Sequence, residues 1–143
     1  MSKYIGLDLG TTTIGIAYSD ALGFVHGLET FRFEPNAYSK AREKVHQVVA
    51  QLGIKNLVLG LPINMDGTEG DRAKSSRKFR DDLLAEDPSL TIDLQDERMT
   101  TISAHKTLNE LNVSSKKRKE SVDRLAACEI LDFYLRRKNN GIR

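Results

Sequence analysis

The chain has 143 residues, of which 39% are hydrophobic, and this suits one folded domain with a buried core rather than two ordinary domains. A single cysteine excludes a disulfide scaffold, and no apolar run reaches the roughly 18 residues of a membrane span, so we expect a cytoplasmic protein without a membrane partner. The 22 Lys and Arg residues against 20 Asp and Glu residues give a net charge of +2, so total charge alone does not indicate a nucleic-acid-binding protein.

Three short segments with alternating apolar and polar residues open the chain. They cover residues 3–9, 13–19 and 24–33, and short turns rich in glycine and small polar residues separate them. Alternation with a period of two is typical of strands with two different faces. Consecutive strands joined by short turns predict an antiparallel meander.

The hydrophobic period changes after the third segment. Apolar residues at helical spacing predict a helix that ends at Gly53, and the apolar run 56–60 predicts a buried strand of a parallel sheet. We further predict a helix over 70–86, a strand over 90–95 and helices over 100–111 and 120–138. The pattern predicts an α/β domain with a mixed five-stranded sheet over residues 1–138, followed by a short tail at 139–143.

Asp8 is the first candidate site residue, because it interrupts an otherwise apolar strand. Aspartate is a poor strand former, and a buried carboxylate costs free energy unless something compensates it. The glycine- and threonine-rich turn at 10–15 would let backbone N–H groups approach a phosphate. The sequence leaves open a simpler interpretation, in which Asp8 faces water at a strand end and the glycine only shapes the hairpin.

Two further carboxylates follow at informative places. Glu97 lies in the run 96–98 after the fifth predicted strand, where α/β folds commonly place their sites. Asp123 shares one face of the last predicted helix with Ala127 and Ile130, and that face is apolar. For the run after the fifth strand, the structural alternative is that the residues after 98 cap the next helix. For Asp123, the alternative is that an acidic residue near a helix N-terminus is electrostatically favourable.

Together, three carboxylates on separate elements would converge at one end of the sheet. Sites built only from oxygen ligands bind Mg²⁺ or Mn²⁺. Two such ions about 4 Å apart would stabilise both the attacking and the leaving oxygen in phosphodiester cleavage. Basic residues gather near these acids, in the run 116–119 and within the helix over 70–86, where they are Arg72, Lys74, Arg77, Lys78 and Arg80. Basic clusters beside an acidic metal site predict a nucleic-acid partner.

These residues together resemble the YqgF family of Holliday-junction-resolvase-like or pre-16S ribosomal RNA nucleases. The matching blocks are residues 6–10, 14–17, 19–20, 58–62, 65–68, 96–98, 100–101, 123, 126–127 and 130–131. The resemblance implies an RNase H-like nuclease domain whose sheet has three antiparallel strands and then two parallel ones. It also implies a catalytic and metal-binding triad of Asp8, Glu97 and Asp123, with Mg²⁺ or Mn²⁺ as the cofactor.

One position departs from the family pattern. The turn after the first strand commonly carries a basic residue where this chain has Thr12, which leaves only a weaker hydrogen bond for a substrate phosphate. We predict Thr12, Arg98, Lys116 and Lys117 as substrate-binding residues, with the lysines supplying the missing positive charge.

The activity that the resemblance implies is hydrolysis of phosphodiester bonds in structured nucleic acid, with 5′-end processing of precursor 16S ribosomal RNA favoured. Resolution of four-way DNA junctions and non-catalytic binding in ribosome assembly or transcription stay open. Symmetric cutting of a junction would call for a homodimer, and the sequence does not choose between monomer and dimer. The turn at 10–12 also resembles a phosphate loop of the actin and sugar-kinase superfamily, but 143 residues leave no room for the duplicated domain.

Overall fold

The computed structural model describes residues 2–99 and 116–139. The elements follow as β1 (Ile5–Leu9), β2 (Thr13–Ser19), β3 (Val25–Arg32), α1 (Tyr38–Leu52), β4 (Asn56–Leu61), α2 (Asp71–Glu86), β5 (Thr91–Asp96), the short 3-10 helix η1 (Glu97–Met99) and α4 (Lys116–Asn139). The predicted strands and the first two predicted helices are confirmed, and the helix predicted over 100–111 lies outside the described residues. The last helix begins at Lys116 and not at residue 120, so the basic run belongs to its first turn.

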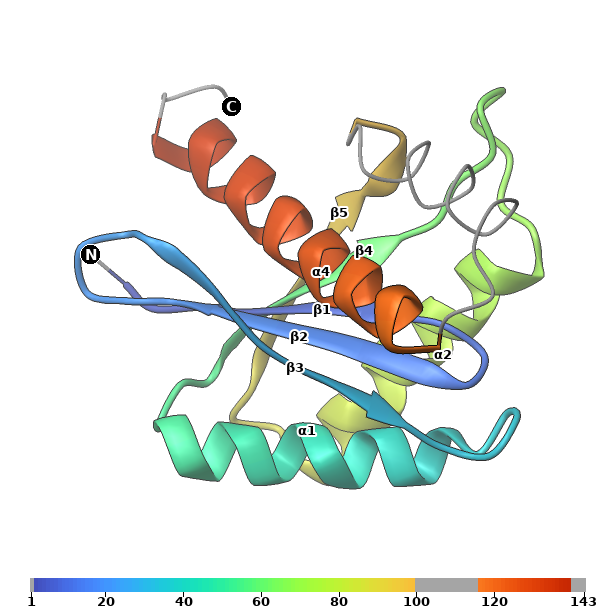
Figure 1. The fold of residues 1–143 in the computed structure, drawn as a ribbon, viewed down its shortest axis with the longest axis horizontal. Helices are drawn as coiled ribbons and strands as arrows, with labels where there is room; N and C mark the ends of the chain where they lie inside the picture. Colours follow the sequence, from blue (N-terminus) through green and yellow to red (C-terminus); the bar gives the residue numbers. More distant parts are fainter. Residues whose placement is uncertain (1, 100–115, 140–143) are drawn as a thin grey trace.

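The five strands form one mixed sheet in the order β3-β2-β1-β4-β5 (Figure 1). Strands β1, β2 and β3 pair antiparallel, whereas β4 pairs parallel with β1 and with β5. This is the predicted RNase H-like arrangement, and it makes β1 the central strand. No helix in the described part of the chain is long and apolar enough to cross a membrane.

Helices cover both faces of the sheet, with α1 and α2 on one side and α4 on the other (Figure 1). Ile5 and Leu7 of β1 join the core under α1 and α2, where Phe79 of α2 is fully buried. On the other face, Tyr4 packs in the cluster that includes Leu131 of α4. The predicted alternation of β1 is therefore confirmed, and Asp8 lies on the α4 side of the sheet.

Helix α4 approaches the sheet closely because glycines face it. A Cβ atom on Gly6 would lie only 2.8 Å from Cβ of Leu131 and 3.0 Å from the main-chain oxygen of Ala127. A Cβ atom on Gly60 would lie 2.5 Å from Cδ1 of Ile130. Real Cβ atoms do not approach other atoms this closely, so α4 occupies a position that side chains on these strands would forbid.

We expect Gly6→Ala to lower the free energy of unfolding by about 1–3 kcal/mol, because the added methyl group forces α4 away from the sheet. Urea unfolding followed by circular dichroism measures the loss. The matched control is Gly70→Ala, where the added Cβ would meet nothing nearer than Nδ2 of Asn64 at 3.8 Å. The control should cost less than about 1 kcal/mol, and equal losses in both variants would contradict the close-packing argument.

Candidate active site

Asp8 occupies the central strand of the sheet on the side that α4 covers. It pairs with Gly15 of β2, and only 2% of its surface is exposed. The interpretation in which Asp8 merely faces water at a strand end is therefore wrong. A carboxylate held this deeply needs compensation by hydrogen bonds or by a cation, which is typical of a functional group rather than of a solvated surface residue.

Glu97 begins η1 directly after β5, and its side chain lies over the neighbouring strand. Its Cγ and Cδ atoms are each 3.1 Å from the position that a Cβ atom on Gly60 would occupy. Gly60 follows Leu59, whose partner on β1 is Leu7, so Gly60 is the neighbour of Asp8 across the sheet. Adjacent strands are about 4.8 Å apart, so the two carboxyl groups belong to one small region beneath α4.

The third predicted acid, Asp123, is part of α4, four residues before the buried Ala127. Its side chain lies outside the described residues, and its place in a triad stays a prediction. Among the described side chains, no group of three His, Cys, Asp or Glu residues forms a metal cluster. The described part of the chain thus supplies two of the three predicted ligands, and these two lie together.

Asp8 and Glu97 fit a hard divalent cation. Both offer carboxylate oxygens, which are the ligands that Mg²⁺ prefers, and two acids in one region create a negative potential that a cation relieves. Because Gly60 has no side chain, the Glu97 side chain occupies the space beside it, and a larger residue at position 60 would fill that space.

The turn that contains Thr12 is tied to the connection between β3 and α1. The main-chain oxygen of Thr12 accepts a hydrogen bond from the N–H of Phe33 at 2.8 Å, and that of Thr11 accepts one from Asn36 at 2.9 Å. Thr12 itself is half-buried. The turn is therefore held firmly beside the end of β1, whereas a substrate contact by the Thr12 hydroxyl stays a prediction.

Arg98 joins the end of β5 to the loop after β4. Its Nη2 and Nε atoms lie 2.8 and 3.0 Å from Oδ2 of Asp96, and Nη1 donates to the main-chain oxygen of Met65 at 3.5 Å. The guanidinium group and its hydrogen bonds hold the pKa of Asp96 below the usual range. Arg98 is thus an anchor in this structure, and its predicted contact with substrate stays a prediction.

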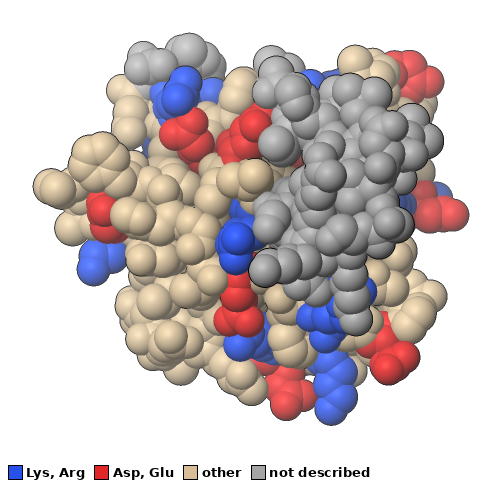
Figure 2. All heavy atoms as spheres, viewed as in Figure 1, with Lys and Arg blue, Asp and Glu red and all other residues tan. Residues whose placement is uncertain are grey.

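The basic residues of α2 are mostly paired with acids. Figure 2 likewise shows Lys and Arg interspersed with Asp and Glu on the described surface around α4. The α2 pairs are Arg77 with Glu69 at 2.7 Å, Lys78 with Asp82 at 3.2 Å and Arg80 with Asp81 at 3.0 Å. The predicted basic cluster is therefore neutralised locally over much of this helix. For Lys116 and Lys117, the structure places the backbone in the first turn of α4, and their side chains lie outside the described residues.

Arg72 belongs to the same predicted basic cluster but makes a different contact. Its Nη2 atom donates a 2.8 Å hydrogen bond to the main-chain oxygen of Leu9, the residue after Asp8. No sequence signal indicates this contact, because the two residues are 63 positions apart. The structure therefore ties Arg72 to the end of β1, one residue after Asp8.

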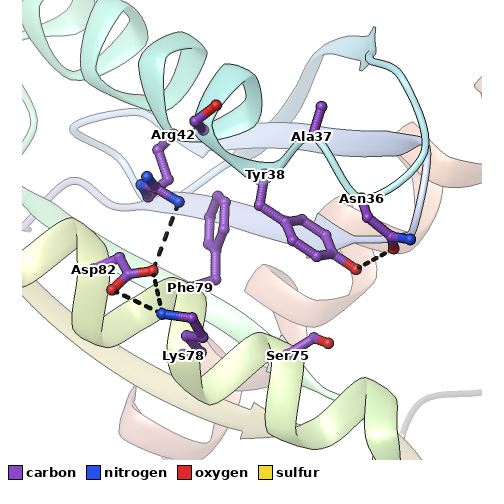
Figure 3. Close-up of a pocket in the computed structure, with 9 residues that line it drawn as sticks. Asn36, Ala37, Tyr38, Arg42, Ser75, Lys78, Phe79 and Asp82 are labelled. Atoms are coloured by element: carbon purple, nitrogen blue, oxygen red, sulfur yellow. Dashed lines mark hydrogen bonds and ion pairs between the residues drawn. The ribbon is translucent and has the colours of Figure 1, made fainter.

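A separate pocket of about 410 Å³ lies between α1 and α2, on the face of the sheet opposite Asp8 (Figure 3). Arg42 and Lys78 both point toward the Asp82 carboxylate, at 3.6 and 3.2 Å, so the two cations in this pocket share one acid. Arg42 also donates to Glu86 at 3.0 Å, just beyond the pocket. The pocket belongs to the α1–α2 contact and not to the acidic site.

The architecture is that of RuvC-type resolvases with an RNase H-like fold. Thermus thermophilus RuvC, solved in complex with a Holliday junction substrate, superposes with a TM-score of 0.62 at 12% identity, covering 99% of this chain and 97% of that one. The yeast mitochondrial Holliday junction resolvase Ydc2 superposes with a TM-score of 0.52 at 10% identity, covering 98% of this chain and 81% of that one. At such low identity the likeness shows the fold alone.

Sequence similarity identifies the family. Residues 2–137 match the family described as RuvX, Holliday junction resolvase. A relative from Oceanobacillus iheyensis is 40% identical over 137 residues, which cover 95% of this chain and 99% of the relative. One from Myxococcus xanthus is 44% identical over 134 residues, which cover 93% of this chain and 87% of the relative; both relatives carry the name "Putative pre-16S rRNA nuclease". The chain belongs to the RuvX family, and the predicted resemblance to YqgF proteins is confirmed.

The contact beside the α1–α2 pocket generates a prediction about acid stability. Hydrogen bonds from His46 and Arg42 hold the pKa of Glu86 below its usual range. A lowered carboxyl pKa stabilises the folded state above the unfolded-state pKa, and this stability is lost as the pH falls through the folded-state pKa. We expect Glu86→Gln to make the free energy of unfolding less dependent on pH between about 5 and 3, by at most about 1 kcal/mol because the side chain is partly exposed.

Urea unfolding at a series of pH values measures this effect. His46→Asn should remove part of the same pH dependence, and the double variant should lose no more than Glu86→Gln alone, since both substitutions break one interaction. If the free energy of unfolding of Glu86→Gln decreases at low pH as steeply as that of the parent, the contact does not contribute to stability.

Proposed function

We propose that this protein is a divalent-metal-dependent nuclease that hydrolyses phosphodiester bonds in the cytoplasm, with 5′-end processing of precursor 16S ribosomal RNA as its activity. The observation that carries the proposal is the buried Asp8 of β1, with the Glu97 side chain from the start of η1 lying over Gly60 of the neighbouring strand β4. The names of relatives about 40% identical to this chain support the choice of substrate.

In this proposal Asp8, Glu97 and Asp123 hold Mg²⁺ or Mn²⁺. When bound, such ions stabilise the attacking and leaving oxygens of phosphodiester hydrolysis. The central strand fixes the position of Asp8, and Gly60 leaves room for Glu97 to approach the same region. Asp123 would complete the set from α4, the helix that packs closely on Gly6 and Gly60.

A second candidate function is the resolution of four-way DNA junctions. The description of the family as a Holliday junction resolvase favours it. Because two strands must be cut symmetrically, this activity would require a homodimer that places two acidic sites on one junction. Precursor RNA processing places no such demand on the chain, and the two activities therefore differ in both substrate and oligomeric state.

We expect Asp8→Asn to lower the rate of cleavage at least about 100-fold, because the amide cannot replace the charge of a metal-binding carboxylate. A labelled RNA that spans the 5′ leader junction of 16S ribosomal RNA and a labelled four-way DNA junction are the two substrates. The matched control is Asp81→Asn, which removes an exposed carboxylate on α2 and should cleave like the parent.

Cleavage of RNA alone, lost in Asp8→Asn, supports the processing activity, and cleavage of the junction alone replaces it with the second candidate. Binding of either substrate without cleavage by the parent protein would overturn the nuclease assignment in favour of a binding factor. Retained cleavage in Asp8→Asn would show that the acidic site is not the catalytic one.

Chelation provides an independent prediction about the metal. We expect EDTA to abolish cleavage and added Mg²⁺ or Mn²⁺ to restore it, while circular dichroism stays unchanged because the apolar cores do not include the site. Metal should also raise the melting temperature of the parent, since a ligand that binds only the folded state stabilises it. Cleavage that continues in EDTA, or an equal melting shift in Asp8→Asn, would contradict the proposed metal site.

A further inference from the structure

We propose that Arg72 is a substrate-binding residue of this site, whose guanidinium group binds a phosphate of the nucleic acid beside the acidic centre. The inference rests on the proposed nuclease function. In this role Arg72 supplies the positive charge that is missing from the turn at 10–12.

The first argument is how the side chain is held. Nη2 of Arg72 donates to the main-chain oxygen of Leu9 at 2.8 Å, and Leu9 is buried in the central strand. One contact of a guanidinium group with a rigid acceptor fixes the direction of its planar fork of N–H donors. Arg72 as a whole is exposed at the start of α2, so the fork is both oriented and accessible.

The second argument is charge. Arg77 and Arg80 on the same helix pair with carboxylates at 2.7 and 3.0 Å, which offset their charge. The partner of Arg72 is a neutral carbonyl, and no acidic side chain among the described residues forms an ion pair with it. Arg72 therefore keeps its full positive charge available for an anion.

The third argument is position. Leu9 directly follows Asp8, and consecutive Cα atoms are 3.8 Å apart, so the guanidinium group is anchored at the end of β1, next to the strand position of Asp8. Divalent ions on the acids and a cation beside them would together contact neighbouring phosphate oxygens of one strand. Arginine suits this role because its fork binds two phosphate oxygens at once.

The test is Arg72→Gln, which keeps an amide N–H for the Leu9 carbonyl and removes the charge. Binding of a labelled RNA spanning the 16S 5′ leader junction is titrated between about 50 and 200 mM salt in the Asp8→Asn background, which prevents cleavage. We expect a roughly tenfold loss of affinity at low salt, and a slope of log affinity against log salt that is about 0.7 smaller, as the loss of one phosphate contact on a single strand requires.

Two variants make the result decisive. Arg80→Gln removes the same charge from the same helix at a paired position, and should leave the slope unchanged; Arg72→Lys should restore it. An unchanged slope in Arg72→Gln, even with a lower melting temperature, would show a purely structural anchor and overturn the proposal. An equal decrease in Arg80→Gln would also overturn it.

The titration separates this inference from the proposed function. If the parent protein cleaves no RNA but Arg72→Gln lowers the salt slope, the nuclease assignment fails and Arg72 still binds phosphate. If the parent cleaves RNA and the slope does not change, the nuclease assignment holds and the role of Arg72 is refuted.

Discussion

The close approach of α4 to the sheet is the constraint on which the rest of the structure depends. Gly6 and Gly60 allow Leu131 and Ile130 to rest on the strands at distances that a Cβ atom would forbid. The same space at Gly60 admits the Glu97 carboxyl group. The packing of the helix and the position of this acid therefore both require that position 60 has no side chain. A side chain at Gly60 would displace both, which means that stability and site geometry cannot be changed independently here.

The placement of Asp8 shows how such a site is sustained. A carboxylate in the central strand weakens the sheet locally, and the opposite face of β1 contributes Ile5, Leu7 and Leu9 to the larger apolar core. Because successive residues of a strand point to opposite faces, the same five-residue segment serves the core and the acidic site. A residue such as Asp8, which disfavours a strand but is held in one by the rest of the fold, is typical of a functional site.

The sequence predicts the parts of this arrangement that depend on local periodicity. Alternation within residues 3–9 indicates both the strand and the face of Asp8, and Gly53 at φ 67° ends α1 as its position predicts. Contacts between distant segments leave no such trace: neither the fit of Glu97 over Gly60 nor the hydrogen bond from Arg72 to Leu9 follows from spacing. The basic helix over 70–86 misleads for a different reason, since its charges are offset by acids one to eight residues away in the sequence, at spacings such as i,i+4 that a count of basic residues alone ignores.

Local pairing of charges changes what a net charge of +2 means for a protein that binds nucleic acid. Where a cation faces an acid a few ångströms away, as Arg77, Lys78 and Arg80 do, that part of the surface attracts phosphate only weakly at a distance. Under the proposed function, affinity would depend on the cations whose charge is not offset and on the metal ions that the acids would hold. Because Arg72 is anchored to the residue after Asp8, the proposed phosphate contact would act beside the position where cleavage is proposed. A chain with modest total charge can in this way favour the productive position of its substrate over the rest of the backbone.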